Sequence, residues 1–255
     1  MGSMCTAIVS LEPGAPALLA GVRDELADRA WQAPGQHWPD HPGLTGGRDL
    51  LAGGTWLAAA PAAQRVTCVL NGRGRLAPAA ARRTRGVLPL LVAGAGKLDS
   101  AGIGQFDPFH LLSVEPGGAV LWSWDGEHLA DQELPPGLHI VVNSGLGSSA
   151  SLGDHELARA GYFLPRLRAA PRPLPRPGPP SAQAWGAWLP LLNGDGLAPG
   201  DPRALIVRRD LGGGRVWGTT SVSLVAVWPD GLRYDFTGTA GDPGAWYEVE
   251  VTSLA

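Results

Sequence analysis

The sequence is poor in cysteine, since Cys5 and Cys68 are the two cysteines among 255 residues. Two cysteines cannot supply a disulfide framework, so we expect both thiols to stay reduced. No apolar stretch reaches the roughly 18 residues that a membrane-spanning helix needs, and no charged-then-apolar leader precedes a small-residue cleavage site. The sequence therefore predicts a cytoplasmic protein without a membrane span.

Lysine is also scarce, because Lys97 is the only one. Arginine supplies the other basic side chains, and 20 basic against 23 acidic residues give a net charge of -3. This balance offers no electrostatic footprint for nucleic acid or for an anionic membrane. The charge therefore favours a small-molecule substrate or ligand, or a protein partner, and it leaves self-association into a homo-oligomer open.

The length of the chain suits one sheet-rich domain with a sizeable core. The opening Met1-Gly2-Ser3 has the form of an expression scar before a natural initiator, Met4. We therefore exclude residues 1–4 from the fold and predict a single domain over residues 5–255. Removal of Met1 alone would leave three residues covering the α-amine of Cys5.

Strand candidates are numerous and are bounded by glycine and proline. In the first half of the chain they are Cys5 to Ser10, Pro16 to Ala20, Arg65 to Leu70, Phe109 to Val114, Ala119 to Trp124 and Leu138 to Asn143. In the second half they are Ala204 to Arg208, Ser221 to Trp228, Leu232 to Phe236 and Trp246 to Val251. Turn residues at 114–118 and 228–231 indicate hairpins between neighbouring strands.

Helical periodicity is found in three segments. They are residues 154–167, a segment that begins with a Ser181 cap, and residues 79–91, which contain Gly86 and Pro89. Strands with intervening helices, but without regular βαβ alternation, indicate an α+β layered domain with a largely antiparallel sheet.

Between the first two helices, proline recurs every few residues from Pro165 to Pro180. A segment of this composition favours polyproline II backbone over a packed element. We therefore expect an extended, exposed connection over 165–180.

Cys5 stands directly behind Met4, at the head of an apolar, β-branched run. A cysteine that becomes the first residue carries its thiol and a free α-amine together. The thiolate is the nucleophile, and a thiol of pKa about 8.5 is only a few per cent ionised at neutral pH. An α-amine of pKa about 8 can take the thiol proton and return it to a leaving amine. Cys5 is therefore a candidate nucleophile for amide chemistry, and the alternative is an apolar strand residue.

A series of short motifs follows along the chain. They are Met4-Cys5, Val22-Arg23-Asp24-Glu25, Gly47-Arg48-Asp49, Gly53-Gly54-Thr55-Trp56-Leu57, Val69-Leu70-Asn71-Gly72, Phe106-Asp107-Pro108-Phe109-His110-Leu111-Leu112 and Val142-Asn143-Ser144. Their order resembles the NRDE family, which opens Met-Cys and carries an Asn-Arg-Asp-Glu signature after its second strand. The matches run from Cys5 to about Val227 and so cover most of the chain.

The resemblance implies the N-terminal nucleophile hydrolase superfamily, and with it a four-layer αββα sandwich of two mainly antiparallel sheets. It implies that Cys5 attacks a small linear amide through a thioester. Arg23 is then expected beside the sulfur, where it favours the thiolate, and Asp24 is expected to hold the α-amine or to orient Arg23. Asn71 and Asn143 are expected to donate to the developing oxyanion, and the alternative is that both are strand-end turn formers.

Trp56 and Thr220 are the positions expected to contact substrate by this resemblance. Thr220 stands where the family has an arginine, and Val22 stands where it has an asparagine. The functions of that family arginine and that family asparagine are therefore absent here. A re-purposed pocket is the alternative to the ordinary family activity.

A haem-binding or trafficking protein is the second functional alternative, because some members of the resembling family are implicated in haem trafficking. The Cys5 thiolate and histidines are candidate axial ligands. Tryptophans that could flank a flat ligand are Trp31, Trp38, Trp56, Trp122 and Trp124, although core packing is the commoner role. As a hydrolase, the chain is expected to need no cofactor.

Two further groups are set aside. His37 and His41 have a spacing that some zinc sites use, but no third ligand lies nearby in the sequence, so no metal site is expected. Arg82, Arg83 and Arg85 fall within the 79–91 helix candidate and are predicted to form a solvated helix face.

Overall fold

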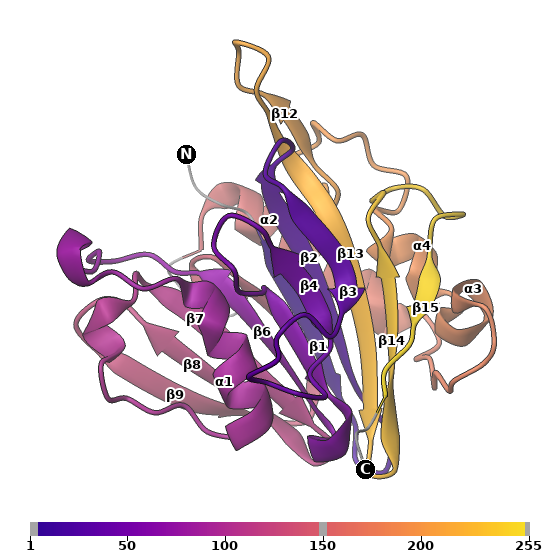
Figure 1. Ribbon diagram of the computed structural model, residues 1–255. Helices are drawn as coiled ribbons and strands as arrows, with labels where there is room; N and C mark the ends of the chain where they lie inside the picture. Colours follow the sequence, from indigo (N-terminus) through magenta and orange to yellow (C-terminus); the bar gives the residue numbers. More distant parts are fainter. Residues whose placement is uncertain (1–4, 148–151, 253–255) are drawn as a thin grey trace.

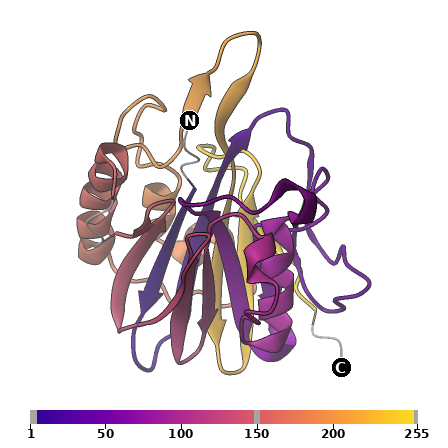
Figure 2. The ribbon, with the colours of Figure 1, turned by 90° about the vertical axis from the view of Figure 1, so that its left-hand side faces the viewer.

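The structure is a computed structural model and describes residues 5–147 and 152–252. Residues 1–4, predicted to be an expression scar followed by the initiator Met4, lie outside the described residues. Two antiparallel sheets stack face to face, and helices cover the outer face of each (Figure 1). The view turned by 90° shows the same layers from the side of the smaller sheet (Figure 2).

The larger sheet has the strand order β11-β10-β1-β2-β13-β14-β15, and β12 pairs with β13. Its strands within the described residues are β1 Thr6–Leu11, β2 Ala17–Leu26, β10 Gly137–Val142, β11 Gly145–Leu146, β12 Arg208–Asp210, β13 Val216–Trp228, β14 Gly231–Thr237 and β15 Tyr247–Val249. Strand β2 lies between β1 and β13 and pairs antiparallel with both.

The smaller sheet is an antiparallel meander in the order β5-β6-β7-β8-β9. Its strands are β5 Leu57–Ala60, β6 Arg65–Asn71, β7 Phe109–Glu115, β8 Gly118–Trp124 and β9 Leu129–Leu134. A separate pair is formed by β3 Trp31–Gly35 and β4 Gly46–Asp49.

The helices divide between the two outer faces. Helix α1 Leu88–Ala95 packs on the smaller sheet through Leu90 and Ala93. The helices that pack on the larger sheet are α2 Asp154–Ala169, α3 Ser181–Trp185 and α4 Trp188–Leu192. Short 3-10 turns are η1 Pro61–Ala63, η2 Ala79–Ala81, η3 Arg85–Val87 and η4 Ile103–Gln105. The expected four-layer αββα sandwich is therefore confirmed.

The alternation of side chains along the central strands builds two separate cores. Val9 of β1 and Leu19 of β2 face the smaller sheet and are fully buried between the sheets. Ile8 and Leu18, their neighbours in sequence, face the helices instead. Because successive residues of a strand point to opposite faces, nearly continuous apolar runs are what a sheet buried on both sides requires.

Most strand predictions are confirmed, and two differ. Strand β2 continues to Leu26, so the Val-Arg-Asp-Glu segment is the end of this strand and does not follow it. The predicted strand at 204–208 is wrong except at Arg208, where β12 begins. There the backbone of Val207 bonds the backbone and hydroxyl of Thr219, and the carbonyl of Ala204 accepts from a side chain, so no regular ladder forms. Strands β3, β4, β5, β9 and β11 were not predicted.

The helix predictions are right in place and wrong in extent. Helix α2 matches the 154–167 segment and continues to Ala169. The segment after Ser181 divides at Gly186, which has a φ of +50° and ends α3. The 79–91 candidate is two 3-10 turns followed by α1, because Pro89 suits only the first turn of a helix.

The proline-rich connection begins later than predicted, because Pro165 lies inside α2. It is also anchored by a buried ion pair on β14. The Arg233 and Asp235 side chains are both 0% exposed, with Nε to Oδ2 at 2.6 Å. Arg233 donates to the carbonyls of Arg176 and Pro179, at 2.5 and 2.8 Å. Polar contacts thus hold this connection against the sheet.

Replacement of Asp235 by alanine is expected to destabilise the fold strongly. It removes the buried partner of the Arg233 guanidinium and leaves the more exposed Glu248, 3.3 Å from Nη1, as the counter-charge. Breaking a buried ion pair in this way costs up to about 3–5 kcal/mol of unfolding free energy. Asp230→Ala is the matched control, because its ion pair with Arg176 is 79% exposed at the carboxylate and such pairs contribute about 0–1 kcal/mol. Urea unfolding measures both. Equal, small losses for the two variants would contradict the structural role of the buried pair.

Candidate active site

A cavity of about 700 Å³ lies at one end of the two stacked sheets. Cys5, at the start of β1, lines it, and so does Arg23, near the end of β2. Because β1 and β2 are antiparallel, the start of one lies beside the end of the other. Asn71, the last residue of β6, brings the smaller sheet into the same cavity. The topology thus gathers these three predicted site residues, and Asp24 and Trp56 line the same cavity.

Arg23 points between the sheets, as Leu19 and Gly21 do on the same strand. Its side chain is 6% exposed, and its guanidinium carbon lies 4.5 Å from the centroid of the Trp56 ring. Burial lowers the pKa of this guanidinium, while the charges of Glu25, Asp49 and Cys5 oppose the shift. Arginine nevertheless stays protonated in proteins, so Arg23 is a fixed cation in the cavity wall near the Cys5 sulfur.

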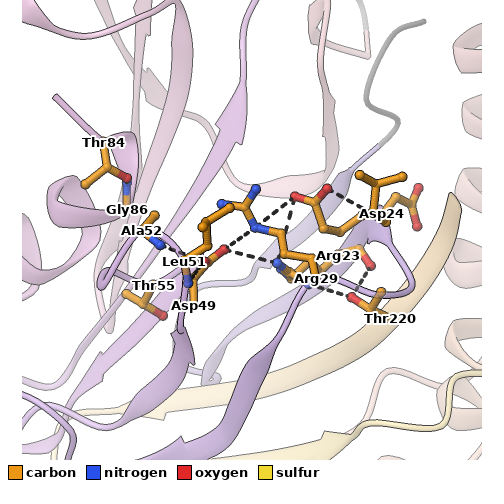
Figure 3. A network of polar contacts seen from close by, with 12 residues as sticks. Arg23, Asp24, Arg29, Asp49, Leu51, Ala52, Thr55, Thr84, Gly86 and Thr220 are labelled. Carbon is orange, nitrogen blue, oxygen red and sulfur yellow. Dashed lines mark hydrogen bonds and ion pairs between the residues drawn. The ribbon is translucent and has the colours of Figure 1, made fainter. Parts of the chain in front are cut away.

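Asp49 joins the cations of this wall (Figure 3). Its Oδ2 lies 2.6 Å from Nε of Arg29 and 3.3 Å from Nη2 of Arg23, and its Oδ1 accepts from the amides of Leu51 and Ala52. Burial by itself raises the pKa of Asp49, but the bonds from Arg29 and Ala52 and the charge of Arg23 hold it below its usual value. Asp49 belongs to the Gly47-Arg48-Asp49 motif, from which no role was predicted for it.

Asp24 points the opposite way from Arg23, toward helix α2. Its Oδ1 accepts from the Thr219 hydroxyl at 2.6 Å, and its Oδ2 lies 4.0 Å from Nη1 of Arg159. Among the described residues, Oδ2 has no hydrogen-bond donor. Burial raises the pKa of Asp24 to about 7, although Arg159 and Thr219 act in the other direction. A buried carboxyl oxygen without a donor is costly and marks a place where one is needed.

Cys5 lies close to both Arg23 and Asp24. The thiol is half-buried, lines the cavity and lies 3.5 Å from the carbonyl oxygen of Asp24. Cys68, in contrast, is buried in the core, and burial raises the pKa of its thiol to about 12. A reactive cysteine must be accessible and able to ionise. Of the two thiols, Cys5 alone meets the condition of access.

The two asparagines are in direct contact. Nδ2 of Asn143, just after β10, donates to the backbone carbonyl of Asn71 at 2.6 Å, and Oδ1 of Asn143 has no partner among the described residues. Asn71 lines the cavity, whereas Asn143 is buried behind it. The predicted donor role is therefore open to the Asn71 side chain, and Asn143 supports the strand end that carries it.

Thr220 reaches the site through an irregularity in β13. The pairing with β2 shifts between Thr219 and Ser221, so that Thr220 is an extra residue. Bulges of this kind re-aim side chains beside functional sites. The Thr220 hydroxyl accepts from Nη1 of Arg23 at 2.8 Å. Trp56 lines the cavity directly, whereas Thr220 acts on Arg23.

The remaining sequence predictions have different outcomes. The prediction for Arg82, Arg83 and Arg85 is wrong, since none of them is on an α-helix and all three line the cavity. Of the tryptophans considered for a flat ligand, Trp56 is the one that lines it. Within the described ranges, no group of three or more histidine, cysteine or acidic side chains could hold a metal ion. Nor is any helix in those ranges long and apolar enough to cross a membrane.

No protein-family model matches this sequence, and no curated protein matches it. Among solved structures, the chain is similar to the Caenorhabditis elegans ortholog of N-acylethanolamine-hydrolyzing acid amidase, with a TM-score of 0.51 and 12% sequence identity. The match covers 96% of this chain and 100% of the other. Likeness at this identity shows a shared fold alone.

The raised pKa of Asp24 predicts how stability depends on pH. Between its ordinary value of 3.8 and about 7, the folded state keeps this proton and the unfolded state loses it. The folded state then binds more protons, so stability falls as pH rises through this window and levels off above it. We expect the unfolding free energy of the wild type to fall relative to that of Asp24→Asn by at most about 1.4 kcal/mol per pH unit.

Urea unfolding at pH 5, 6, 7 and 8 measures this difference. Asp131→Asn, on the exposed face of β9, is the matched control for the loss of one carboxylate. Curves for the wild type and Asp24→Asn that stay parallel from pH 5 to 7 would show that Asp24 ionises normally.

Proposed function

We propose that this protein is a cysteine N-terminal nucleophile hydrolase that cleaves or transfers the acyl group of a small linear amide. The observation that carries the proposal is the position of Cys5: its half-buried thiol lines a cavity together with Arg23 and Asn71. The fold is shared with a solved amide hydrolase, which supports this reaction class. The NRDE resemblance points the same way, and we propose membership of that family.

The reaction needs Cys5 as the first residue. Its α-amine takes the thiol proton, and the thiolate adds to the amide carbonyl carbon, so a C–S bond forms and the carbonyl oxygen becomes negative. The C–N bond then breaks while the α-ammonium returns the proton to the leaving amine, which leaves a thioester. Attack by water gives the acid and hydrolysis, whereas attack by another amine gives acyl transfer.

The surrounding side chains suit these steps. Arg23 is a cation near the sulfur, and a nearby cation lowers a thiol pKa. Oδ2 of Asp24, which lacks a donor among the described residues, is the proposed partner of the Cys5 α-ammonium. The Asn71 amide is the proposed oxyanion donor, with Asn143 holding its backbone. A donor of this kind is worth about 3 kcal/mol of barrier in known hydrolases.

Replacement of Cys5 by alanine tests the nucleophile. We expect turnover of an acyl amide to fall by about 10³-fold or more, because binding and oxyanion contacts alone remain. Cys68→Ala is the matched control and should keep most of the activity, since that thiol is buried in the core. Mass spectrometry of protein that begins at Cys5 should also show an acyl adduct on the N-terminal peptide. Full turnover by Cys5→Ala would refute the mechanism.

Haem binding, the alternative, finds less support at this cavity. Among the described lining residues none is histidine, so Cys5 is the axial-ligand candidate there. Titration with haemin tests it, and at micromolar protein we expect no saturable Soret shift. A saturable shift that Cys5→Ala abolishes would favour the haem protein over the hydrolase.

A further inference from the structure

The outer wall of the cavity is a segment rich in arginine, residues 79–87. It is fixed in place by main-chain hydrogen bonds: the amide of Thr55 donates to the carbonyl of Gly86 at 2.8 Å, and the amide of Arg83 donates to Gln105 at 2.8 Å. A Cβ atom on Gly54 would lie 2.3 Å from the backbone of Gly86. This close approach needs glycine at position 54. The wall is thus a built part of the site.

The carboxylates that line the cavity already have cationic partners. Asp49 pairs with Arg23 and Arg29, and Glu25 lies 3.6 Å from Arg29. In the outer wall, Oδ1 of Asp107 lies 3.1 Å from Nε of Arg82. The arginines that line the cavity therefore outnumber these carboxylates.

Arg83 and Arg85 are the cations that remain. Across residues 5–147 and 152–252, neither has a carboxylate oxygen within 4.0 Å. Neutral groups orient both: Nη1 of Arg85 donates to the carbonyl of Pro108 at 2.8 Å, and the Arg83 guanidinium lies 5.1 Å from the Phe106 ring centroid. Two guanidinium groups are therefore held in the cavity wall with free donors.

The environment of Arg85 makes an unpaired charge costly. The residue is half-buried, and burial lowers the pKa of its guanidinium although Asp107 and Cys5 oppose the shift. Buried charges in proteins are normally paired. A guanidinium group matches a carboxylate or a phosphate in geometry and can bind either with two parallel hydrogen bonds.

We propose that this cavity recognises an anionic group of the substrate through Arg85, assisted by Arg83. The inference rests on the proposed amide hydrolysis and names its substrate class. The substrate is a small amide whose acyl or amine part carries a carboxylate or a phosphate, bound while the scissile carbonyl faces Cys5. A neutral amide of the same length lacks the group that these cations need.

Binding to the Cys5→Ala protein tests the site without any turnover. We expect calorimetric titration to detect glutarate or inorganic phosphate, and not the neutral glutaramide. Arg85→Gln should weaken the bound anion about tenfold or more, because it removes a charge-assisted hydrogen bond. Arg85→Lys should keep part of the affinity. Arg75→Gln is the matched control, since Arg75 is 75% exposed and does not line the cavity.

Preference between glutarate and phosphate identifies which anion the substrate carries, and either result supports the site. The anion site would be overturned if neither anion binds. It would also be overturned if the folded protein with Arg85 and the folded Arg85→Gln variant bind the anion with equal affinity. Circular dichroism and the melting temperature check that the variants fold.

Kinetics separate this inference from the proposed function. With protein that begins at Cys5, we expect kcat/KM for glutaryl-7-amino-4-methylcoumarin to exceed that for the neutral pentanoyl amide about tenfold, and Arg85→Gln to remove the difference. Equal rates for the two amides would overturn the anion site and leave the hydrolase intact. Anion binding that depends on Arg85, without turnover of any amide, would overturn the hydrolase and leave the anion site intact.

Discussion

The register of β2 between β1 and β13 is the constraint on which the site depends. Arg23 and Asp24 are adjacent in sequence, yet one points between the sheets and the other toward helix α2. This division holds only because β2 is paired on both sides, with Val22 opposite Thr6 and Val222. A slip of one residue would exchange the faces. The carboxyl group of Asp24 would then face Trp56, and the guanidinium group of Arg23 would face Arg159 of helix α2.

The opposite directions of Arg23 and Asp24 also place charged groups with different pKa shifts on the two faces of β2. The face between the sheets holds Arg23 and Arg29 around Asp49, whose pKa lies below its usual value, so the cations there keep a charged partner. The helix face holds Asp24, whose pKa burial raises to about 7. Both features suit the thiol chemistry that we propose for Cys5, because a cation favours the thiolate and the Asp24 oxygen without a donor can accept a hydrogen bond. Burial acts in the same direction on both carboxyls, and the difference between them comes from the hydrogen bonds and cations that Asp49 has around it.

The features that were predicted correctly from the sequence are those that depend on local sequence pattern. Apolar runs bounded by glycine and proline located most strands, and the turn at 228–231 located the hairpin of β13 and β14. Cys5 was identified from its position behind Met4, and Arg23 and Asn71 through a family resemblance; the structure brings all three to one cavity. The arginine wall was missed because its residues are held by contacts with residues 54, 55 and 105–108, which no periodicity encodes. Likewise, the bulge at Thr220 depends on a partner strand nearly 200 residues away in sequence.

The bulge and the wall together suggest how a shared fold acquires a different pocket. By the NRDE resemblance, the position of Thr220 holds an arginine, and here the threonine hydroxyl accepts a bond from Arg23. The strand therefore contributes no cation at that point. Arg83 and Arg85 supply cations from the opposite wall, on a segment whose place is fixed by Gly54 and Gly86. Because the sheets stay as they are, cations can be placed on a different wall without altering the proposed nucleophile, and substrate choice in the proposed reaction can change independently of its chemistry.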